Sequence, residues 1–474
     1  MKPDFEPFWP AEYTYYAIAA AIGLLLVMGA FFGTLLMPPL WLIANLVVLA
    51  VYFITVTNVS SRALKNPGDY SWKLFRMAWI ARLLFGMTII LLAEFETGRS
   101  FYVGAVDAVK YQNVSSQLAD IISSGNFNQI HPLLVSMYFE HTDNYGVPLL
   151  LGFTYAMFGS SIYVGKVLYT LIGSGTVVLI YKTTRLIWGE ATARLAGILF
   201  AFFPLALFYS SVLLKEEVVV FLSMLAIFIM VKSTVLTRIR IRDLILLIFV
   251  ITSIFLFRTA AGALLVALVA GTFVLNRLKG SLIVSLSTAV VILGGFFWFL
   301  DVFGEVEYYV ERVTNAADFA EARIRDVARG NALATIMGTP VFVALSFIAP
   351  FPSMVYLPLG NLSHDATYYW ISGLMIWNFL AFFGLWGLWK AFWEKRSESL
   401  PVWGFAAGYS FILGFTALFT TVRFGYNAMP AFFILISAGI AYRKEFPYWK
   451  IYMLGALLLI FAWNLFRLAG RGML

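Results

Sequence analysis

The stretch ARLAGILFAFFPLALFYSSVLLKEEVVVFLSMLAIFIMVK, residues 193–232, decides the class of this fold. It contains two long apolar runs separated by one charged triplet, Lys215-Glu216-Glu217. A helix needs about 20 apolar residues to cross the hydrocarbon layer of a membrane, where every backbone polar group must be satisfied within the segment. Because each run approaches that length, the stretch predicts two membrane-spanning helices joined by a charged turn.

The whole chain has the same character. Of its 474 residues, 61% are hydrophobic and only 12% are charged, and the mean hydropathy is +0.85. This composition excludes a water-soluble globular protein. The net charge of +8 is then interpreted as loop charge sorted across a bilayer, not as a nucleic-acid surface. The chain has no cysteine, which excludes disulfides, thiolate zinc sites and cysteine nucleophiles.

The pattern of apolar runs predicts an all-α polytopic membrane protein with about thirteen transmembrane helices. The expected spans lie near 14–37, 40–56, 77–94, 163–181, 193–213, 217–232, 242–257, 260–276, 281–300, 369–390, 402–421, 428–442 and 450–467.

Charge sorting predicts the orientation of these spans, because cytoplasmic loops collect Lys and Arg. Together with the N-terminus, the alternate loops on one side hold 20 of the 33 Lys and Arg residues but only 9 of the 25 Asp and Glu residues. The N-terminus is therefore expected in the cytoplasm and the C-terminus outside. The first span follows an acidic start without a small-residue cleavage site, so we expect it to stay as an anchor.

Two segments, 95–162 and 301–368, are too long for simple turns, and both are expected on the external side. Within the first, 109–122 is amphipathic, and 147–158 is too short to span and suits an interfacial helix. The second begins with a charged helical run at 306–329. It continues with 332–348, expected to lie in or on the outer leaflet, and ends at prolines within 349–352. Long loops of this kind are typical places for function.

Ionisable side chains beside apolar spans need a solvated, structural or functional explanation. At the external ends of spans lie the triplet Lys215-Glu216-Glu217, Arg258 and Arg423, while Arg82 lies deeper in its span. The triplet offers a cation and two carboxylates, which can meet a phosphate or a metal, or can simply reach water at the turn. The two arginines on the external side oppose the positive-inside trend. They are interpreted either as phosphate ligands or as interfacial anchors.

Asp107 opens the amphipathic stretch of the first long segment, in Gly104-Ala105-Val106-Asp107. By residue chemistry alone it is a candidate helix N-cap. The three histidines share no metal-ligand spacing, and no tight metal motif is present. The phosphate-binding glycine loops of nucleotide hydrolases are also absent from the sequence. Metal binding by histidine and nucleotide hydrolysis are therefore not predicted.

Four stretches together resemble the GT-C superfamily of polyprenyl-phosphate-sugar-dependent glycosyltransferases, including the bacterial protein mannosyltransferase and aminoarabinose transferase families. The stretch 104–119 (GAVDAVKYQNVSSQLA) is similar to the family's Asp followed by a Tyr-containing helix, and 145–159 (YGVPLLLGFTYAMFG) to its Pro-Leu helix ending in Phe-Gly. The stretch 187–217 resembles the next pair of elements, which ends with an acidic residue at the external mouth. Residues 423–430 (RFGYNAMP) resemble a late Arg-x-x-Tyr-x-x-x-Pro element.

The resemblance implies a single GT-C-like transmembrane domain over 1–474. Residues 1–76 form a two-helix N-terminal addition, and 77–474 form the core with its external loops. The family's usual Asp-Glu pair reads Asp107-Ala108 in this chain, which leaves a second acidic role to Glu216 or Glu217.

The same resemblance implies an inverting transfer in which Asp107 is the general base for an acceptor hydroxyl. Glu216 or Glu217 would orient the base or coordinate a divalent cation, although nothing in the sequence demands a metal or another cofactor. The predicted site divides into three groups: catalytic Asp107, Glu216 and Glu217; donor-phosphate-binding Lys215, Arg258 and Arg423; and acceptor or donor contacts Lys110, Tyr111 and Tyr426.

The implied partners are a polyprenyl-phosphate-linked sugar, membrane lipid and an acceptor that is a glycan, lipid or protein. The implied location is a plasma (inner) membrane, with the site on the external or periplasmic side. Two alternatives stay open. A lipid-linked glycan polymerase or ligase would also use external arginines, and a lipid or oligosaccharide transporter would carry charges at mid-membrane. A GT-C-shaped protein that binds lipid-linked glycans without turning them over is a further alternative.

Overall fold

The computed structural model describes residues 9–63, 68–98, 100–101, 105–136, 144–236, 240–277, 340–355, 370–394, 396–415 and 421–469. Across these residues the protein is almost entirely helical, which confirms the predicted all-α class. The described extended pairing is one isolated antiparallel bridge between Leu36 and Val355.

Seven of the described helices are long and apolar enough to cross a membrane. They are α1 (Ala11–Phe32), α2 (Pro39–Ala63), α3 (Ser71–Thr97), α7 (Ile162–Trp188), α10 (Lys215–Val235), α16 (Ile371–Glu394) and α20 (Trp449–Ala469). The remaining bundle helices are α8 (Glu190–Ala201), α9 (Pro204–Tyr209), α11 (Ile241–Phe255), α12 (Thr259–Arg277), α17 (Arg396–Phe415), α18 (Val422–Tyr426) and α19 (Met429–Ala441). The predicted number of spans is therefore not confirmed, and the predicted span 281–300 lies outside the described residues.

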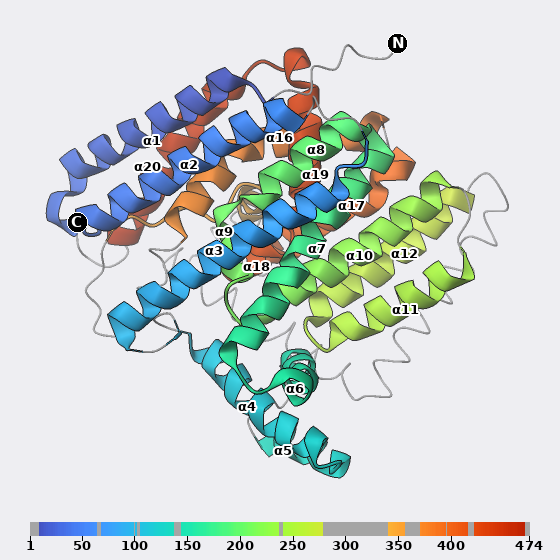
Figure 1. Cartoon of the computed structure of the whole chain (residues 1–474). Helices are drawn as coiled ribbons and strands as arrows, with labels where there is room; N and C mark the ends of the chain where they lie inside the picture. The colour runs from blue at the N-terminus through green and yellow to red at the C-terminus, as the bar shows by residue number, and fades with distance from the viewer. Residues whose placement is uncertain are drawn as a thin grey trace.

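The helices form a bundle with a buried central group and an outer group of helices on each of two sides (Figure 1). At the centre α7 packs on α3, α8 and α10, and α16 packs on α19. On one side lie α1, α2 and α20, and on the other lie α11 and α12. The apolar window of α16 is 83% buried, whereas those of α1, α2 and α20 are each 28% buried. The outer helices therefore present apolar faces outward, as expected of helices in contact with lipid.

Two glycines allow α16 and α19 to approach closely at the centre of the bundle. A Cβ atom added to Gly387 would lie 1.8 Å from the carbonyl oxygen of Leu435, and one added to Gly439 would lie 1.9 Å from that of Phe383. These distances are too short for any side chain. Small residues at such crossings are typical of helices that pack within membranes.

The predicted continuous span 193–213 is wrong, because the chain forms two short helices there. The helix α8 ends at Ala201, and Phe203 has an extended backbone, with φ −64° and ψ 121°. Proline disfavours helical geometry in the residue before it, and Pro204 then starts α9 at a position where proline is well tolerated.

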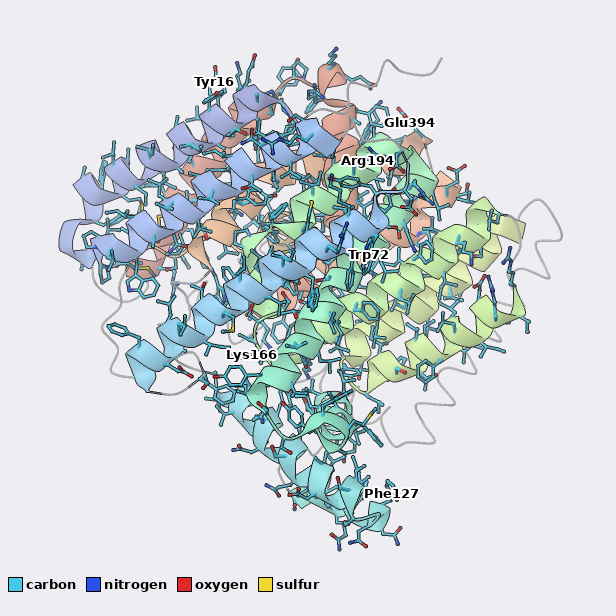
Figure 2. All side chains as sticks on the ribbon, viewed as in Figure 1. Tyr16, Trp72, Phe127, Lys166, Arg194 and Glu394 are labelled. Carbon is cyan, nitrogen blue, oxygen red and sulfur yellow. The ribbon has the colours of Figure 1, made fainter. Side chains whose placement is uncertain are left out.

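The first long segment is largely helical, as expected. It forms α4 (Val106–Ser123), η2 (Phe127–Gln129), α5 (Ile130–Ser136) and α6 (Gly146–Phe158). This confirms the helices predicted at 109–122 and 147–158. They protrude from one end of the bundle with Phe127 near the tip (Figures 1 and 2). We call this end the α4 end.

Little of the second long segment is described. The predicted helix at 306–329 lies outside the described residues, and of 332–348 the described part is helical over 340–346. The segment after it leaves the helix at the predicted prolines and packs on α16. There the Asn378 side chain donates to the carbonyl oxygens of Ile348 and Pro350, at 2.6 and 3.2 Å.

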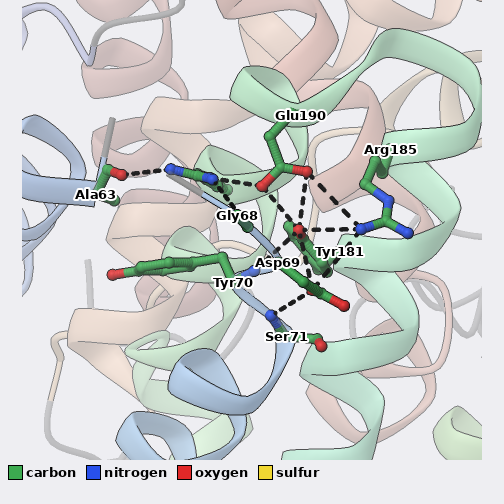
Figure 3. A network of polar contacts seen from close by, with 9 residues as sticks. Ala63, Gly68, Asp69, Tyr70, Ser71, Tyr181, Arg185 and Glu190 are labelled. Atoms are coloured by element: carbon green, nitrogen blue, oxygen red, sulfur yellow. Dashed lines mark hydrogen bonds and ion pairs between the residues drawn. The ribbon is translucent and has the colours of Figure 1, made fainter. Parts of the chain in front are cut away.

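The opposite end of the bundle carries a polar network that we call the α8 network: Asp69, Tyr181, Arg185, Glu190 and Arg194. Figure 3 shows the first four of these side chains. The Arg194 side chain donates to Glu190 at 2.6 Å and to the carbonyl oxygens at positions 63 and 68, at 2.6 and 2.8 Å. The Tyr181 hydroxyl donates to Glu190 at 2.7 Å. This network fixes the turn between α2 and α3 against α7 and α8. Figure 2 shows Arg194 far along the bundle from Lys166 on α7.

Candidate active site

Asp107 lies in the first turn of α4, where the chain enters the protruding segment. The residue at the N-cap position is Ala105, and no side chain caps this helix. The N-cap interpretation of Asp107 is therefore wrong. Its carboxylate instead pairs with Arg423 Nη1, and 46% of the side chain remains exposed. A carboxylate near a helix N-terminus is also stabilised by the helix dipole.

Arg423 joins Asp107 to a second carboxylate. It lies on α18, a helix of five residues, and its Nε donates to Glu216 Oε1 at 2.5 Å. Burial lowers the pKa of Arg423, but the carboxylates of Glu216 and Asp107 outweigh that effect and raise it above its usual value. This guanidinium is therefore a permanent cation that links α4, α10 and α18.

Glu216 is fully buried in the first turn of α10, and its carboxylate also pairs with a second arginine. Arg258, from the turn between α11 and α12, donates from Nη2 to Glu216 Oε1 at 2.7 Å. The guanidinium of Arg258 also lies 4.7 Å from the centre of the Phe424 ring, a distance that fits a cation–π contact. We call Asp107, Glu216, Arg258 and Arg423 the arginine cluster.

The arginine cluster is incompletely paired. Among the described residues, Glu216 Oε2 and Arg258 Nε are buried without a hydrogen-bond partner. Buried polar groups in proteins are normally satisfied, and the exceptions need an explanation. The open positions fit a cluster that binds a further polar group.

Glu217 faces away from the arginine cluster, towards the interior of the bundle. Its Oε2 accepts a hydrogen bond of 2.8 Å from the hydroxyl of Tyr426, and it interacts electrostatically with the buried Arg82. Its Oε1 and Arg82 Nε lie around Gly173 of α7, where an added Cβ would be 2.4 and 2.8 Å from them. Consecutive helix positions point in different directions, so the two predicted acidic residues lie in separate surroundings. We call Arg82, Glu217 and Tyr426 the Arg82 layer.

The remaining predicted residues surround these two groups. The Lys215 side chain is directed to the residues just before α6, where its Nζ donates to Asn144 Oδ1 at 2.8 Å. Tyr111, one turn after Asp107, is buried and interacts electrostatically with Arg423 and Glu216; burial raises the pKa of its hydroxyl above the usual value. Lys110 is half-buried on the same helix.

Sequence reasoning assigned no role to three residues of this region. Arg82 was noticeable as an arginine within an apolar span, but its partner could not be inferred. The Tyr169 side chain of α7 is buried and interacts electrostatically with Tyr111 and Glu216. Neither Tyr169 nor Gly173 carries a signal in the sequence that separates it from ordinary helix packing.

The carboxylates of the site do not form a metal site in their present arrangement. Within the described ranges, no three histidine, aspartate or glutamate side chains could hold one metal ion. Asp107 and Glu216 are joined through the guanidinium of Arg423, and a cation would have to replace it. In this arrangement the carboxylates of Asp107 and Glu216 are paired with arginine.

Comparisons with known proteins bear on part of this site. Residues 144–302 match the family described as dolichyl-phosphate-mannose-protein mannosyltransferase. A comparison with curated proteins found no match.

Two solved structures with some likeness are of an oligosaccharyltransferase from Archaeoglobus fulgidus. One is in complex with zinc and sulfate: it is 17% identical, with 84% of this chain and 52% of that chain covered and a TM-score of 0.43. The other, AglB in complex with an inhibitory peptide and a dolichol-phosphate, is 14% identical, with coverages of 85% and 56% and the same TM-score of 0.43. The chain thus spans about half the length of these proteins, and at this TM-score the likeness does not establish a shared fold.

The family match covers the segment that holds the charged triplet and Arg258, while Asp107 and Arg423 lie outside it. The matched residues run from the start of α6 through α12, so they include α7 and α10, the helices that carry Gly173 and the two buried glutamates. The match is therefore a similarity of this segment to that family, and it leaves the rest of the chain unmatched.

Proposed function

We propose that the protein is an inverting glycosyltransferase that moves a sugar from a polyprenyl-phosphate donor to an acceptor hydroxyl. The single observation that carries the proposal is the convergence of Asp107, Glu216, Arg258 and Arg423 at the α4 end. These residues come from four separate elements, and the carboxylate of Asp107 remains partly exposed.

In the proposed reaction the Asp107 carboxylate takes the proton of the acceptor hydroxyl. The acceptor oxygen attacks the anomeric carbon from the side opposite the phosphate, and the bond between that carbon and the phosphate oxygen breaks with its electron pair leaving on the phosphate. A lipid phosphate is already anionic, so the reaction depends mainly on position and positive charge. Arg258 and Arg423 supply that charge, with Lys215 at the edge of the site. No step requires a metal or another cofactor.

The ion pair between Asp107 and Arg423 would make donor binding precede the action of the base. A phosphate that binds Arg423 competes with Asp107 for the same guanidinium. Donor binding would therefore release the base at the moment when the sugar is in place. Lys110 and Tyr111 lie on the same helix as Asp107, and we assign to them contacts with the acceptor or donor. The Tyr426 side chain is fully buried against Glu217, so we assign it no such contact.

The experiment uses the purified full chain in liposomes with dolichyl-phosphate-mannose, and with other polyprenyl-phosphate sugars as separate trials. Release of the lipid phosphate and formation of a glycosylated product are measured, and the anomeric configuration of the product is compared with that of the donor. We expect transfer with inversion. A retained configuration, or movement of an intact labelled donor across the bilayer without loss of its sugar, would overturn the proposal; the second result would indicate a transporter.

We also propose that the α4 end faces the outside of a plasma membrane, as the charge sorting of the loops favours. The chain has no cysteine, so an introduced cysteine carries the protein's single thiol. Its labelling shows on which side of the membrane that residue lies. An impermeant thiol reagent added to intact cells should label Ser124→Cys, at the exposed end of α4, but not Ser61→Cys near the α8 network. Labelling of the second variant alone would reverse the orientation.

A further inference from the structure

Two neighbouring glutamates of α10 contact the same short helix through two different residues. Glu216 accepts from Arg423 at 2.5 Å, and Glu217 accepts from Tyr426 at 2.8 Å. Arg423 and Tyr426 are three residues apart on α18, so both lie on one side of it. The helix is therefore attached to α10 at two points one turn apart.

The helix α18 needs such attachment. It contains five residues, and its N-cap residue Thr421 makes no side-chain capping bond. A single helical turn is unstable without tertiary contacts, because fixing it costs more conformational freedom than its few hydrogen bonds return. Its buried anchor is Tyr426, which has no exposed surface and stacks on Tyr209 with 4.3 Å between ring centres.

Behind Tyr426 lie two ionisable side chains, Arg82 and Glu217, that interact electrostatically and that the proposed reaction does not use. Arg82 is fully buried on α3, and its Nη1 donates to the carbonyl oxygens of Ala201 and Ala78, at 3.1 and 3.3 Å. Among the described residues, Arg82 Nε and Nη2 and Glu217 Oε1 have no hydrogen-bond partner. Gly173 leaves the space between the carboxylate and the guanidinium. Ionisable groups buried in a membrane bundle are costly and usually have a role.

We propose that Arg82 and Glu217 form a positioning device: Arg82 holds the Glu217 carboxylate as the acceptor for Tyr426, and this bond sets α18 so that Arg423 reaches both Asp107 and the donor phosphate. The kinetic part of the inference rests on the proposed function. The positional part rests on the geometry alone and is tested separately.

The positional test follows the accessibility of α18. In the cysteine-free chain, Thr421→Cys places a thiol at the start of this helix, and its rate of reaction with a maleimide is measured in the full protein. Adding Tyr426→Phe removes the hydroxyl that donates to Glu217 and keeps the ring. We expect the reaction rate to rise about tenfold, which corresponds to about 1.4 kcal/mol for a lost hydrogen bond to a charged group.

Two further variants act on the carboxylate. Glu217→Gln keeps an oxygen for Tyr426 but removes the charge opposite Arg82, and Gly173→Ala pushes on Glu217 Oε1 from α7 without altering any charged residue. Each should raise the reaction rate less than Tyr426→Phe does. If Glu217→Gln fails to fold, the thiol reaction rate in Tyr426→Phe decides the test, because this variant leaves the buried charges unchanged.

The matched control is Tyr209→Phe, which removes the hydroxyl of the other ring of the stack and leaves the bond to Glu217 in place. It should not change the reaction rate at Thr421→Cys. A thiol at Ser124→Cys, on the exposed end of α4, should react at the same rate in all variants, which excludes general loosening of the protein.

The kinetic test measures transfer from dolichyl-phosphate-mannose in Tyr426→Phe. Because α18 carries Arg423, which binds the donor phosphate in the proposed reaction, we expect KM for the donor to rise about tenfold with a smaller loss of kcat. A merely structural role would reduce the amount of folded protein and leave KM unchanged.

The two proposals fail in different ways. Unchanged thiol reactivity in Tyr426→Phe, or an equal rise in Tyr209→Phe, overturns the positioning device even when the parent protein transfers sugar. Raised reactivity together with no transfer by the parent protein overturns the proposed function and leaves the positional part standing.

Discussion

Both the α8 network and the arginine cluster pair arginines with carboxylates, but they differ in how completely their polar atoms are paired. In the α8 network, Arg194 places its Nε, Nη1 and Nη2 on a carboxylate and two backbone carbonyl oxygens. In the arginine cluster at the α4 end, Glu216 and Arg258 each have a buried atom that is unpaired among the described residues. The same holds for Arg82 and Glu217 in the Arg82 layer, which lies next to this cluster in the interior of the bundle. The helix α7 connects both regions, since it packs on α6 at one end and carries Tyr181 and Arg185 at the other.

This difference indicates different roles. A saturated network of hydrogen bonds fixes a turn and has no capacity for another partner. A cluster with open donors and acceptors keeps that capacity at a cost in stability, which is typical of functional sites. The comparison therefore predicts that substitutions at the α4 end act mainly on activity, and that substitutions in the α8 network act mainly on stability.

The largest effect is expected for Asp107→Asn. The amide keeps the shape of the side chain but cannot accept the proton, and general base catalysis contributes about 10²- to 10⁴-fold to rate. We expect kcat to fall by about 10³-fold with little change in folding, because the side chain is half exposed. The control Asp120→Asn, an exposed change on the same helix, should retain activity. Full activity in Asp107→Asn would remove this residue as the base.

The next effect is expected for Arg423→Ala, which removes the link between the two carboxylates. We expect kcat/KM for the donor to fall about 10²-fold, since a charged bidentate contact to phosphate is lost. Arg258→Ala should act in the same direction but more weakly. An arginine at the opposite end, Arg76, provides the control: Arg76→Ala should leave donor use unchanged. Unchanged donor dependence in Arg423→Ala would assign it to anchoring.

A smaller and different effect is expected for Arg194→Ala in the α8 network. The change removes charged hydrogen bonds at a side chain that is 6% exposed, so we expect the free energy of unfolding to fall by about 2 kcal/mol. The donor KM of the folded protein should not change. Thermal unfolding of the detergent-solubilised chain measures the loss, with Arg242→Ala, an exposed arginine, as the control. A raised donor KM in Arg194→Ala would contradict the division between the two ends.

The smallest effect concerns pH and Asp69. A backbone hydrogen bond from Ser71 is the main cause that lowers the pKa of the Asp69 carboxyl, with Arg185 adding to it. A lowered pKa in the folded protein gives stability that is present above the unfolded value of about 3.9 and is lost as the pH falls through the folded value. Asp69→Asn should therefore lower the unfolding temperature slightly near neutral pH, and this difference should disappear in the most acidic samples. A difference that grows with acid would contradict the assignment.

Much of the helical pattern could be predicted from the sequence. The apolar runs gave α1, α2, α3, α7, α10, α16 and α20, and the amphipathic run after Asp107 gave α4. The break between α8 and α9 was missed because hydropathy does not register how Pro204 acts on Phe203. The number of spans could not be fixed, since α6, α12 and α19 are apolar but short over their described residues.

The site was only partly predictable. Charges placed against the positive-inside trend singled out Arg258 and Arg423, and the position of the triplet singled out the two glutamates. Their partners could not be predicted, because Asp107 and Arg423 are 316 residues apart in the chain. Nothing in the sequence indicated that Glu216 and Glu217 would face different surroundings, or that Gly173 would make room for one of them.

The sequence alone determined that this chain is a helical membrane protein whose unusual charges lie near the ends of its spans, because hydropathy and charge act over neighbouring residues. The tertiary structure decided which of those charges meet. Helix packing brings α4, α10, α18 and the turn between α11 and α12 together at one end, and a cluster of opposite charges is stable there only because each helix is held by contacts elsewhere in the bundle.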